Sequence, residues 1–222
     1  MAGHEGRLNV LASNLANSGT SGFKRELATV REVSMMRRLG PVRGVTNVSK
    51  VDFSQGKLER TGRDLDLALD GSGFFAVEGD EGEVYTRDGS FHLTRDGVLV
   101  ADDGRQVAWE SQSGFLDATG DPILVRGNGE VRQGNQLMGQ LRVVDFEDLT
   151  QISRQSDGYW VAPEKLKQAI PTGEIHQGAL ETSNANPIEE LIQMITLQRS
   201  YESLTSTFKG LSDTFRRLTR PF

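Results

Sequence analysis

The C-terminal segment of the chain has its most regular hydrophobic pattern. Between Asn186 and Phe222, apolar side chains recur at alternating steps of four and three residues, which is the a/d spacing of a coiled coil. An amphipathic helix packed on its own domain would share part of this pattern, but the strict register favours a helix that lies against another helix. The apolar positions expected to form its interface are Leu191, Ile195, Leu197, Tyr201, Leu204, Phe208, Leu211, Phe215 and Leu218.

Both ends of this predicted helix carry typical boundary residues. Asn186 is a suitable N-cap, Pro187 fits the first helical position, and Glu189 stands where a capping box has its acidic side chain. Arginines occur near the other end, where the helix dipole is negative, and Pro221 stops the helix. A helix from Pro187 to about Thr219 would be roughly 50 Å long, which is more than a compact domain of this size needs.

A second helical pattern occupies the start of the chain. His4, Leu8, Leu11 and Leu15 follow the same four-three-four rhythm, and Ser18-Gly19 ends it with a C-terminal glycine. We expect residues 1–19 to form a helix whose leucines meet the C-terminal helix. Residues 20–62 lack a clear period and contain breakers at Gly40-Pro41, so they predict an extended linker with one strand near Val48–Phe53.

From Asp64 the pattern changes to a period of two. Leu65, Leu67 and Leu69 alternate with polar or small residues, which predicts a half-buried strand. Short apolar runs then recur at close spacing as far as Tyr159–Ala162. Asp-Gly pairs at 88–89, 96–97 and 103–104 separate several of them and predict type I′ hairpin turns. The tetrapeptide TRDG occurs twice, at 86–89 and 94–97, as a local hairpin echo.

These patterns predict an α+β fold: an antiparallel β-rich central domain inserted between N- and C-terminal helices that pair as a coiled coil. The expected divisions are a helix over 1–19, a linker over 20–62, a β-rich domain over 63–177 and a coiled-coil helix over 178–222.

Composition narrows the class of partner. The 222 residues carry a net charge of −6, which argues against a general nucleic-acid or anionic-membrane binder. Cysteine is absent, so disulfides, thiolate zinc sites and a cysteine nucleophile are excluded. No apolar run has the length of a transmembrane helix, and the first residues lack the apolar core of a signal peptide.

No catalytic pattern emerges from the sequence. His4, His92 and His176 are far apart and stand in no metal-binding motif. The Asp-rich turns do not have the ligand order of a calcium loop, and no nucleophile elbow or phosphate loop is present. Trp109 and Trp160 are expected to pack in the core or at its rim. We therefore expect no enzyme activity, and neither a catalytic, a cofactor nor a metal site.

Three stretches together resemble a known family. NLAN at 14–17 followed by GFKR at 22–25 is similar to the N-terminal signature of flagellar rod and hook axial proteins. QGKLERTG at 55–62, LDLALDG at 65–71, GFF at 73–75 and YTRDGSF at 85–91 resemble the family's central motif. GALETSN at 178–184, with the residues after Pro187, resembles its C-terminal signature. The signature positions carried over are Asn14, Asn17, Gly22, Phe23, Gly62, Asp66, Gly71, Gly73, Phe74 and Asn184.

The resemblance implies a structural subunit of the bacterial flagellar basal-body rod, closest to the proximal-rod protein and next to the distal-rod protein. It implies polymerisation through the terminal helices into a hollow drive shaft that transmits torque from motor to hook. Implied partners are copies of the chain, other rod proteins and the flagellar type III export apparatus. The implied location is the periplasm-spanning rod, reached without a cleaved signal peptide. Family members carry further residues before the position of His4, so this N-terminal helix is expected to be a shortened coiled-coil half.

Alternatives remain open at this stage. A distal-rod or hook-type axial subunit would share the same motifs. In different classes, a secreted glycan-acting enzyme would use a carboxylate pair on the β domain, and an adhesin would share the terminal helices.

Overall fold

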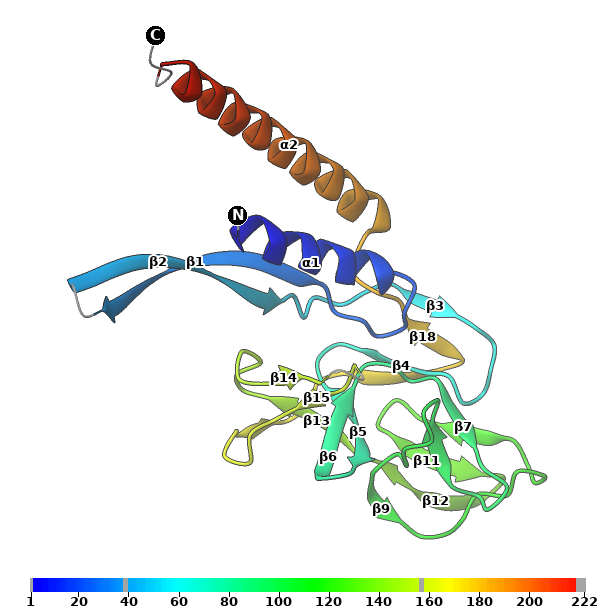
Figure 1. Ribbon diagram of the computed structural model, residues 1–222. Helices are drawn as coiled ribbons and strands as arrows, with labels where there is room; N and C mark the ends of the chain where they lie inside the picture. The colour runs from blue at the N-terminus through cyan, green and yellow to red at the C-terminus, as the bar shows by residue number, and fades with distance from the viewer. Residues whose placement is uncertain (1, 38–39, 156–157, 219–222) are drawn as a thin grey trace. The chain divides into compact units, whose positions relative to one another are not determined.

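The computed structural model describes residues 2–37, 40–155 and 158–218. The chain forms two compact units (Figure 1). Unit 1 comprises residues 1–17, 26–52 and 185–222, and unit 2 comprises residues 18–25 and 53–184. The chain therefore passes between the units four times, and each unit is built from segments far apart in the sequence.

Unit 1 contains two helices and one hairpin. Helix α1 (Ala2–Ala16) contacts helix α2 (Pro187–Leu218) and both strands of the hairpin, β1 (Glu26–Arg37) and β2 (Gly40–Val51). The strands pair in antiparallel register from Glu26 opposite Val51 to Arg37 opposite Gly40. The expected linker over 20–62 is therefore wrong for most of its length. Its breakers lie at and beside the end of a ribbon, where they permit a chain reversal.

The helix boundaries confirm one prediction and correct another. The Ile188 N–H donates to Asn186 Oδ1 at 3.0 Å, so Asn186 caps α2 as expected. Glu189 takes part by accepting from the Asn186 side-chain amide at 3.2 Å. Helix α1 ends before Gly19, which does not adopt the left-handed conformation of a C-terminal glycine. Instead, the Asn17 side chain donates to the Ser13 carbonyl at 2.8 Å and caps the last turn.

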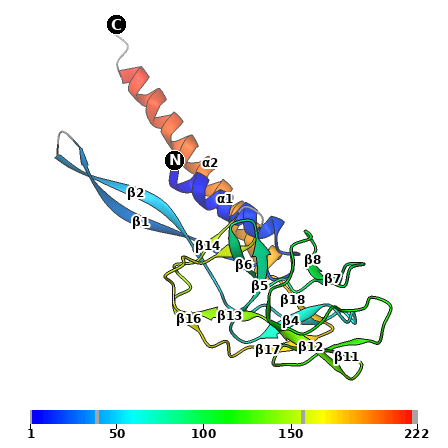
Figure 2. The ribbon, with the colours of Figure 1, turned by 90° about the horizontal axis from the view of Figure 1, so that it is seen from below.

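Unit 2 is built from short antiparallel strands, which Figure 2 shows from a second direction. One sheet has the order β14-β15-β6-β5-β13-β16 and another the order β10-β11-β12-β9, while β17-β4, β18-β3 and β7-β8 form pairs. The strands are β3 (Leu58–Arg60), β4 (Leu67–Asp70), β5 (Phe74–Gly79), β6 (Gly82–Thr86), β7 (Phe91–Leu93), β8 (Leu99–Ala101), β9 (Trp109–Gln112), β10 (Ile123–Val125), β11 (Glu130–Gln133), β12 (Gln136–Leu141), β13 (Val143–Phe146), β14 (Ser153–Arg154), β15 (Trp160–Val161), β16 (Gln168–Ala169), β17 (Glu174–Gln177) and β18 (Ala179–Glu181).

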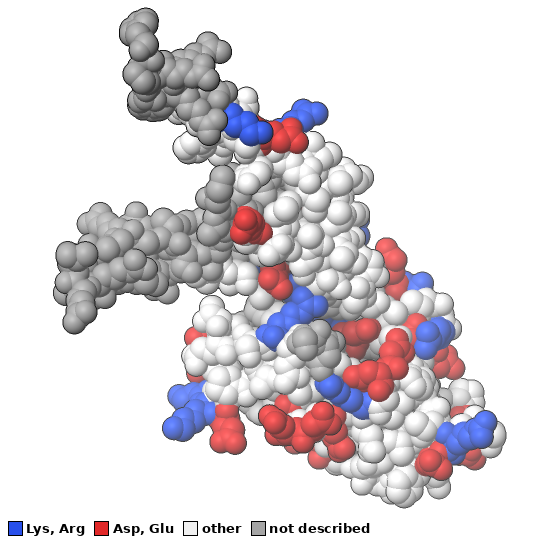
Figure 3. Space-filling model, viewed as in Figure 1, with Lys and Arg blue, Asp and Glu red and all other residues white. Residues whose placement is uncertain are grey.

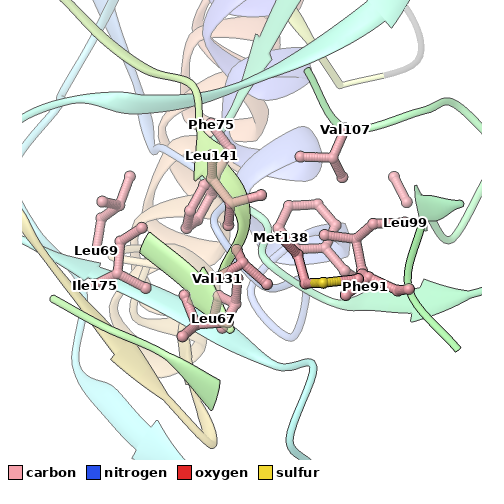
Figure 4. Close-up of a cluster of buried hydrophobic side chains, with 13 residues drawn as sticks. Leu67, Leu69, Phe75, Phe91, Leu99, Val107, Val131, Met138, Leu141 and Ile175 are labelled. Carbon is pink, nitrogen blue, oxygen red and sulfur yellow. The ribbon is translucent and has the colours of Figure 1, made fainter. Parts of the chain in front are cut away.

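The hydrophobic core of unit 2 surrounds β4 (Figure 4). Leu67 and Leu69 pack with Phe75, Phe91 and side chains from the four-stranded sheet. Ala68, between the two leucines, is also fully buried. The prediction that this strand is half-buried is therefore wrong, because other segments cover both of its faces.

The Asp-Gly turns differ from the predicted type. A type I′ turn needs a positive φ at both central residues, and no non-glycine residue in the described part of the chain has one. The aspartates instead accept hydrogen bonds from backbone two residues ahead. Asp88 Oδ1 accepts from the Ser90 N–H at 3.1 Å, and Asp103 Oδ1 accepts from the Arg105 N–H at 3.2 Å.

The structure thus confirms an α+β chain with antiparallel strands between two terminal helices. Neither helix, over its described residues, has the length and apolar character needed to cross a membrane.

Candidate assembly surface and signature cluster

The two helices of unit 1 run antiparallel. Asn14, near the end of α1, lies beside Glu190 in the first turn of α2. Glu5 and Leu8, further toward the start of α1, line a groove of about 480 Å³ with Leu197 and Tyr201 of α2. The leucines of α1 differ in burial, since Leu11 is buried while Leu8 and Leu15 are half-buried. The structure therefore brings the N-terminal leucines together with the first part of the C-terminal apolar stripe.

Asn14 connects three elements of unit 1. Its side-chain Nδ2 donates to the Glu26 carbonyl at 2.8 Å and to Glu190 Oε2 at 3.3 Å, and its Oδ1 accepts from the Glu26 N–H at 2.8 Å. Asn14 is 1% exposed and Glu190 is fully buried. The signature asparagine thus fixes α1 to the start of β1 and to the start of α2.

The rest of the apolar stripe on α2 has no cover within the described structure. A helix of 15 residues is about 22 Å long and one of 32 residues about 48 Å, so α1 faces only the first half of α2. Beyond Glu202, the side chain of Phe208 is 65% exposed, and Leu204 and Leu211 are about half exposed. Leu191, Ile195 and Tyr201 are partly exposed in the first half. Phe215 and Leu218 continue the helix, and their side chains lie outside the described residues.

A buried charge cluster lies in unit 2. Lys24 Nζ donates to Glu181 Oε1 at 2.6 Å and to the Ser54 carbonyl at 2.9 Å. Arg87 donates to Glu181 Oε2 at 3.3 Å and to the Gly71 carbonyl at 2.8 Å. The three charged side chains are at most 6% exposed. Burial lowers the pKa of Arg87, and the Glu181 carboxylate opposes that shift.

The signature positions surround this cluster. Asn184 Oδ1 accepts from the Arg25 N–H at 2.7 Å, and its Nδ2 donates to the Ser54 carbonyl at 2.9 Å. Gly22 donates its N–H to the Glu181 carbonyl at 2.7 Å and has a φ of 67°. A Cβ at Gly22 would lie 2.3 Å from the Asp88 nitrogen, so only glycine fits there.

The central motif closes the other side. Phe74 is buried beneath the Arg87 guanidinium, whose Cζ lies 5.2 Å from the ring centroid. The Gly71 carbonyl accepts from Arg87, and both Gly71 and Gly73 have a positive φ. Phe23, Gly62 and Asp66 complete the set: Phe23 is buried under Arg154, the Gly62 N–H donates to the Gly178 carbonyl at 3.2 Å, and the Asp66 carbonyl accepts from the Gly178 N–H at 2.8 Å.

No group of three or more His, Asp or Glu side chains in the described chain is placed to hold a metal ion. The chemistry that the geometry does support is packing: buried charge pairs join distant segments, and an apolar stripe extends past its partner helix.

Comparison with known proteins agrees with these two features. Three family models match in chain order: "Flagella basal body rod protein" over residues 5–24, "Flagellar hook protein FlgE/F/G D1 domain" over 68–162 and "Flagellar basal body rod FlgEFG protein C-terminal" over 176–220. The flagellar basal-body rod protein FlgF of Caulobacter vibrioides is 34% identical over 218 residues, covering 94% of this chain and 89% of the relative. The chain belongs to the flagellar basal-body rod protein family.

Other relatives in this rod family carry two names. The FlgG rod protein of Buchnera aphidicola subsp. Acyrthosiphon pisum is 31% identical over 245 residues, covering 96% of this chain and 93% of the relative. The FlgF rod protein of Escherichia coli is 29% identical over 220 residues, covering 92% and 87%. The rod-family matches therefore extend over nearly the full length of these relatives.

The sequence patterns did not single out the charged residues at the centre of the signature cluster. Lys24, Arg87 and Glu181 stand inside the quoted motifs, beside the glycines and aromatic residues that were listed. A signal was present, because each charge adjoins residues that pack in the core of this rod-family chain. Such proximity along the sequence favours burial but does not identify the ion partner.

Proposed function

We propose that this rod-family chain polymerises through its terminal helices, with α1 and α2 pairing as a coiled coil, into the hollow shaft that transmits torque from motor to hook. The observation that carries the proposal is the apolar stripe of α2 beyond Glu202, which lies exposed at Leu204, Phe208 and Leu211. Monomeric proteins rarely leave such contiguous apolar surface uncovered. Neighbouring subunits are the cover that a rod provides.

A rod requires contacts that repeat without closing a ring in the plane of one dimer. Heterologous interfaces have this property, because the surface that each subunit presents is completed by a different surface on the next. The α1–α2 groove and the exposed half of α2 are two such different surfaces on one unit. We infer that the stripe residues Leu8, Leu11, Leu15, Leu191, Ile195, Leu197, Tyr201, Leu204, Phe208, Leu211, Phe215 and Leu218 serve as the assembly interface.

We infer a place in the proximal part of the rod, on the compact stretch from Val51 to Leu69 that led to this assignment from the sequence. Relatives named FlgF and relatives named FlgG both match, so a distal-rod role is the competing proposal. In either case, the chain would leave the cell interior through the flagellar type III export apparatus and would have no catalytic role.

Purified hook–basal bodies test the proposal. Mass spectrometry of these particles should detect the chain, and a deletion strain should lose the rod and its motility. Adding back the intact gene is the control. Intact rods and normal swimming in the deletion strain would contradict a structural role. Cleavage of peptidoglycan by the purified chain would instead support the enzyme alternative.

A further inference from the structure

The two units of the chain carry opposite net charge. Unit 2 has 14 basic and 23 acidic residues, a net charge of −9, whereas unit 1 has 11 basic and 8 acidic residues, a net charge of +3. The overall charge of −6 conceals this division. Figure 3 shows the acidic side chains distributed over the surface of the β-rich unit.

The positive charge of unit 1 is concentrated in the β1–β2 hairpin. Residues 33–50, here called the basic hairpin, contain Arg37, Arg38, Arg43 and Lys50 and no acidic residue. In the sheet arrangement of the described chain, β1 pairs with β2 alone, so each strand has one unpaired edge. Figures 1 and 2 both show the ribbon extending past the start of α1. A two-stranded ribbon is at best marginally stable without further packing, which points to a partner for the extended part.

Unit 2 contains a hollow with the complementary charge. It has a volume of about 250 Å³ and is lined by residues from four segments, 20–23, 86–90, 101–103 and 154–160. Asp88, Asp102 and Asp103 contribute carboxylates, and Arg154 is the one basic residue among its described lining residues. We call this the acidic hollow. Its volume lies below the roughly 300–1,000 Å³ of small-molecule pockets and suits a single side chain.

The charges in the acidic hollow are not balanced locally. Burial raises the pKa of Asp88, and the negative charges of Asp102 and Asp66 raise it further against the lowering effect of the Ser90 N–H. Arg154 is directed onto aromatic faces, with its Cζ 4.2 Å from the Phe23 centroid and 5.8 Å from that of Trp160. A cation entering the hollow would therefore relieve repulsion among the carboxylates. Guanidinium suits such a place, since it pairs with carboxylates and tolerates aromatic neighbours.

We propose that the basic hairpin of one copy docks on unit 2 of a neighbouring copy and inserts an arginine into the acidic hollow. The inference rests on the proposed function, because it needs two copies side by side in one rod. It assigns a second interface to the chain, separate from the apolar stripe on α2. Opposite charges on the two surfaces would favour correct pairing and speed encounter more than they would add affinity.

The natural absence of cysteine makes a crosslinking test direct. Val42→Cys in β2 and Thr20→Cys, an exposed residue that lines the acidic hollow, are introduced together. Purified hook–basal bodies are treated with a short bismaleimide crosslinker. We expect a covalent dimer of the chain on denaturing gels. The matched control replaces Thr20→Cys with Thr119→Cys, an exposed residue that does not line the hollow, and should give no dimer.

Charge variants separate docking from folding. Arg37→Glu with Arg43→Glu should abolish the crosslink, whereas Arg37→Lys with Arg43→Lys should retain it. Rods that contain the chain but give no dimer would overturn this inference and leave the proposed function standing. A crosslink confined to single chains, or to a different rod protein, would likewise overturn it. Absence of the chain from purified rods would overturn the proposed function and this inference together.

Discussion

The Asn14 side-chain amide donates to Glu190 Oε2 at 3.3 Å, across 176 positions of sequence. The contact joins the two ends of the chain into one unit, and both side chains are buried. A hydrogen bond to a buried charged group is worth more than one between neutral groups, and leaving such a group without it is costly. The signature asparagine is therefore a structural requirement of unit 1.

Asn14→Ala should destabilise unit 1 by about 1–3 kcal/mol, since Glu190 and the Glu26 backbone lose their partner. Urea unfolding of the purified chain, followed by hydrogen exchange in α1, measures the effect. Asn17→Ala is the control, because Asn17 donates only to the nearby Ser13 carbonyl. Equal losses in the two variants would contradict a special role for Asn14.

Glu181→Gln should destabilise unit 2 strongly. Removing one partner from a buried ion pair costs about 3–5 kcal/mol, and Glu181 here serves two cations, Lys24 and Arg87. Glu59→Gln, an exposed substitution on the neighbouring strand β3, should change the free energy of unfolding little. A Glu181→Gln chain as stable as the Glu59→Gln chain would show that the cluster does not hold unit 2 together.

Gly22→Ala and Gly19→Ala should have opposite outcomes. At Gly22 a Cβ would meet the Asp88 backbone at 2.3 Å in a left-handed conformation, whereas at Gly19 it would meet nothing within 4 Å. We expect Gly22→Ala to lower the melting temperature and Gly19→Ala to leave it unchanged or raise it slightly. Thermal unfolding by circular dichroism makes the comparison, and similar melting temperatures would argue against the close approach.

Asp88→Asn should stabilise unit 2 at neutral pH. Because the pKa of Asp88 is raised in the folded state, the native chain binds this proton more tightly than the unfolded chain does. Its contribution to stability therefore falls as the pH rises from the ordinary Asp pKa through the folded value. The variant lacks this loss. The stability difference between variant and wild type should grow with pH over that window, and a constant difference would contradict the assigned cause.

Sequence patterns foretold the helices better than the sheets. The cap at Asn186 and the stripe on α2 depend on neighbouring residues, so local rules suffice for them. The two TRDG tetrapeptides show where such rules end. Arg87 in the first is buried against Glu181, while Arg95 in the second is exposed. Identical sequences have different environments because segments distant in the chain cover only the first.

The same reason explains the other differences. Residues 26–51 have no strong alternation, and their pairing as a hairpin depends on cross-strand register between β1 and β2. Strand β4 alternates in sequence yet is covered on both faces. The charge cluster joins Lys24 to Glu181 across 157 positions, a separation at which spacing alone gives no information.

The exposed half of α2 should be weakly ordered in the isolated chain. Its apolar stripe has no partner in the described structure to offset the entropy lost on ordering. Hydrogen exchange of dilute monomer should therefore show rapid exchange from Ser203 onward and slower exchange in the core strands β4 and β5. Equal protection in both regions would indicate that α2 needs no neighbour.

Incorporation of a stripe variant into rods tests the central claim most directly. Phe208→Asp places a charge on the exposed apolar stripe, while Ser206→Asp places the same charge off the stripe on the same helix. The amount of each chain in purified hook–basal bodies is measured by quantitative mass spectrometry, with circular dichroism confirming that unit 2 is folded. We predict that Phe208→Asp is excluded from rods and that Ser206→Asp is incorporated normally. Incorporation of Phe208→Asp at the wild-type level, with normal motility, would contradict assembly through this stripe.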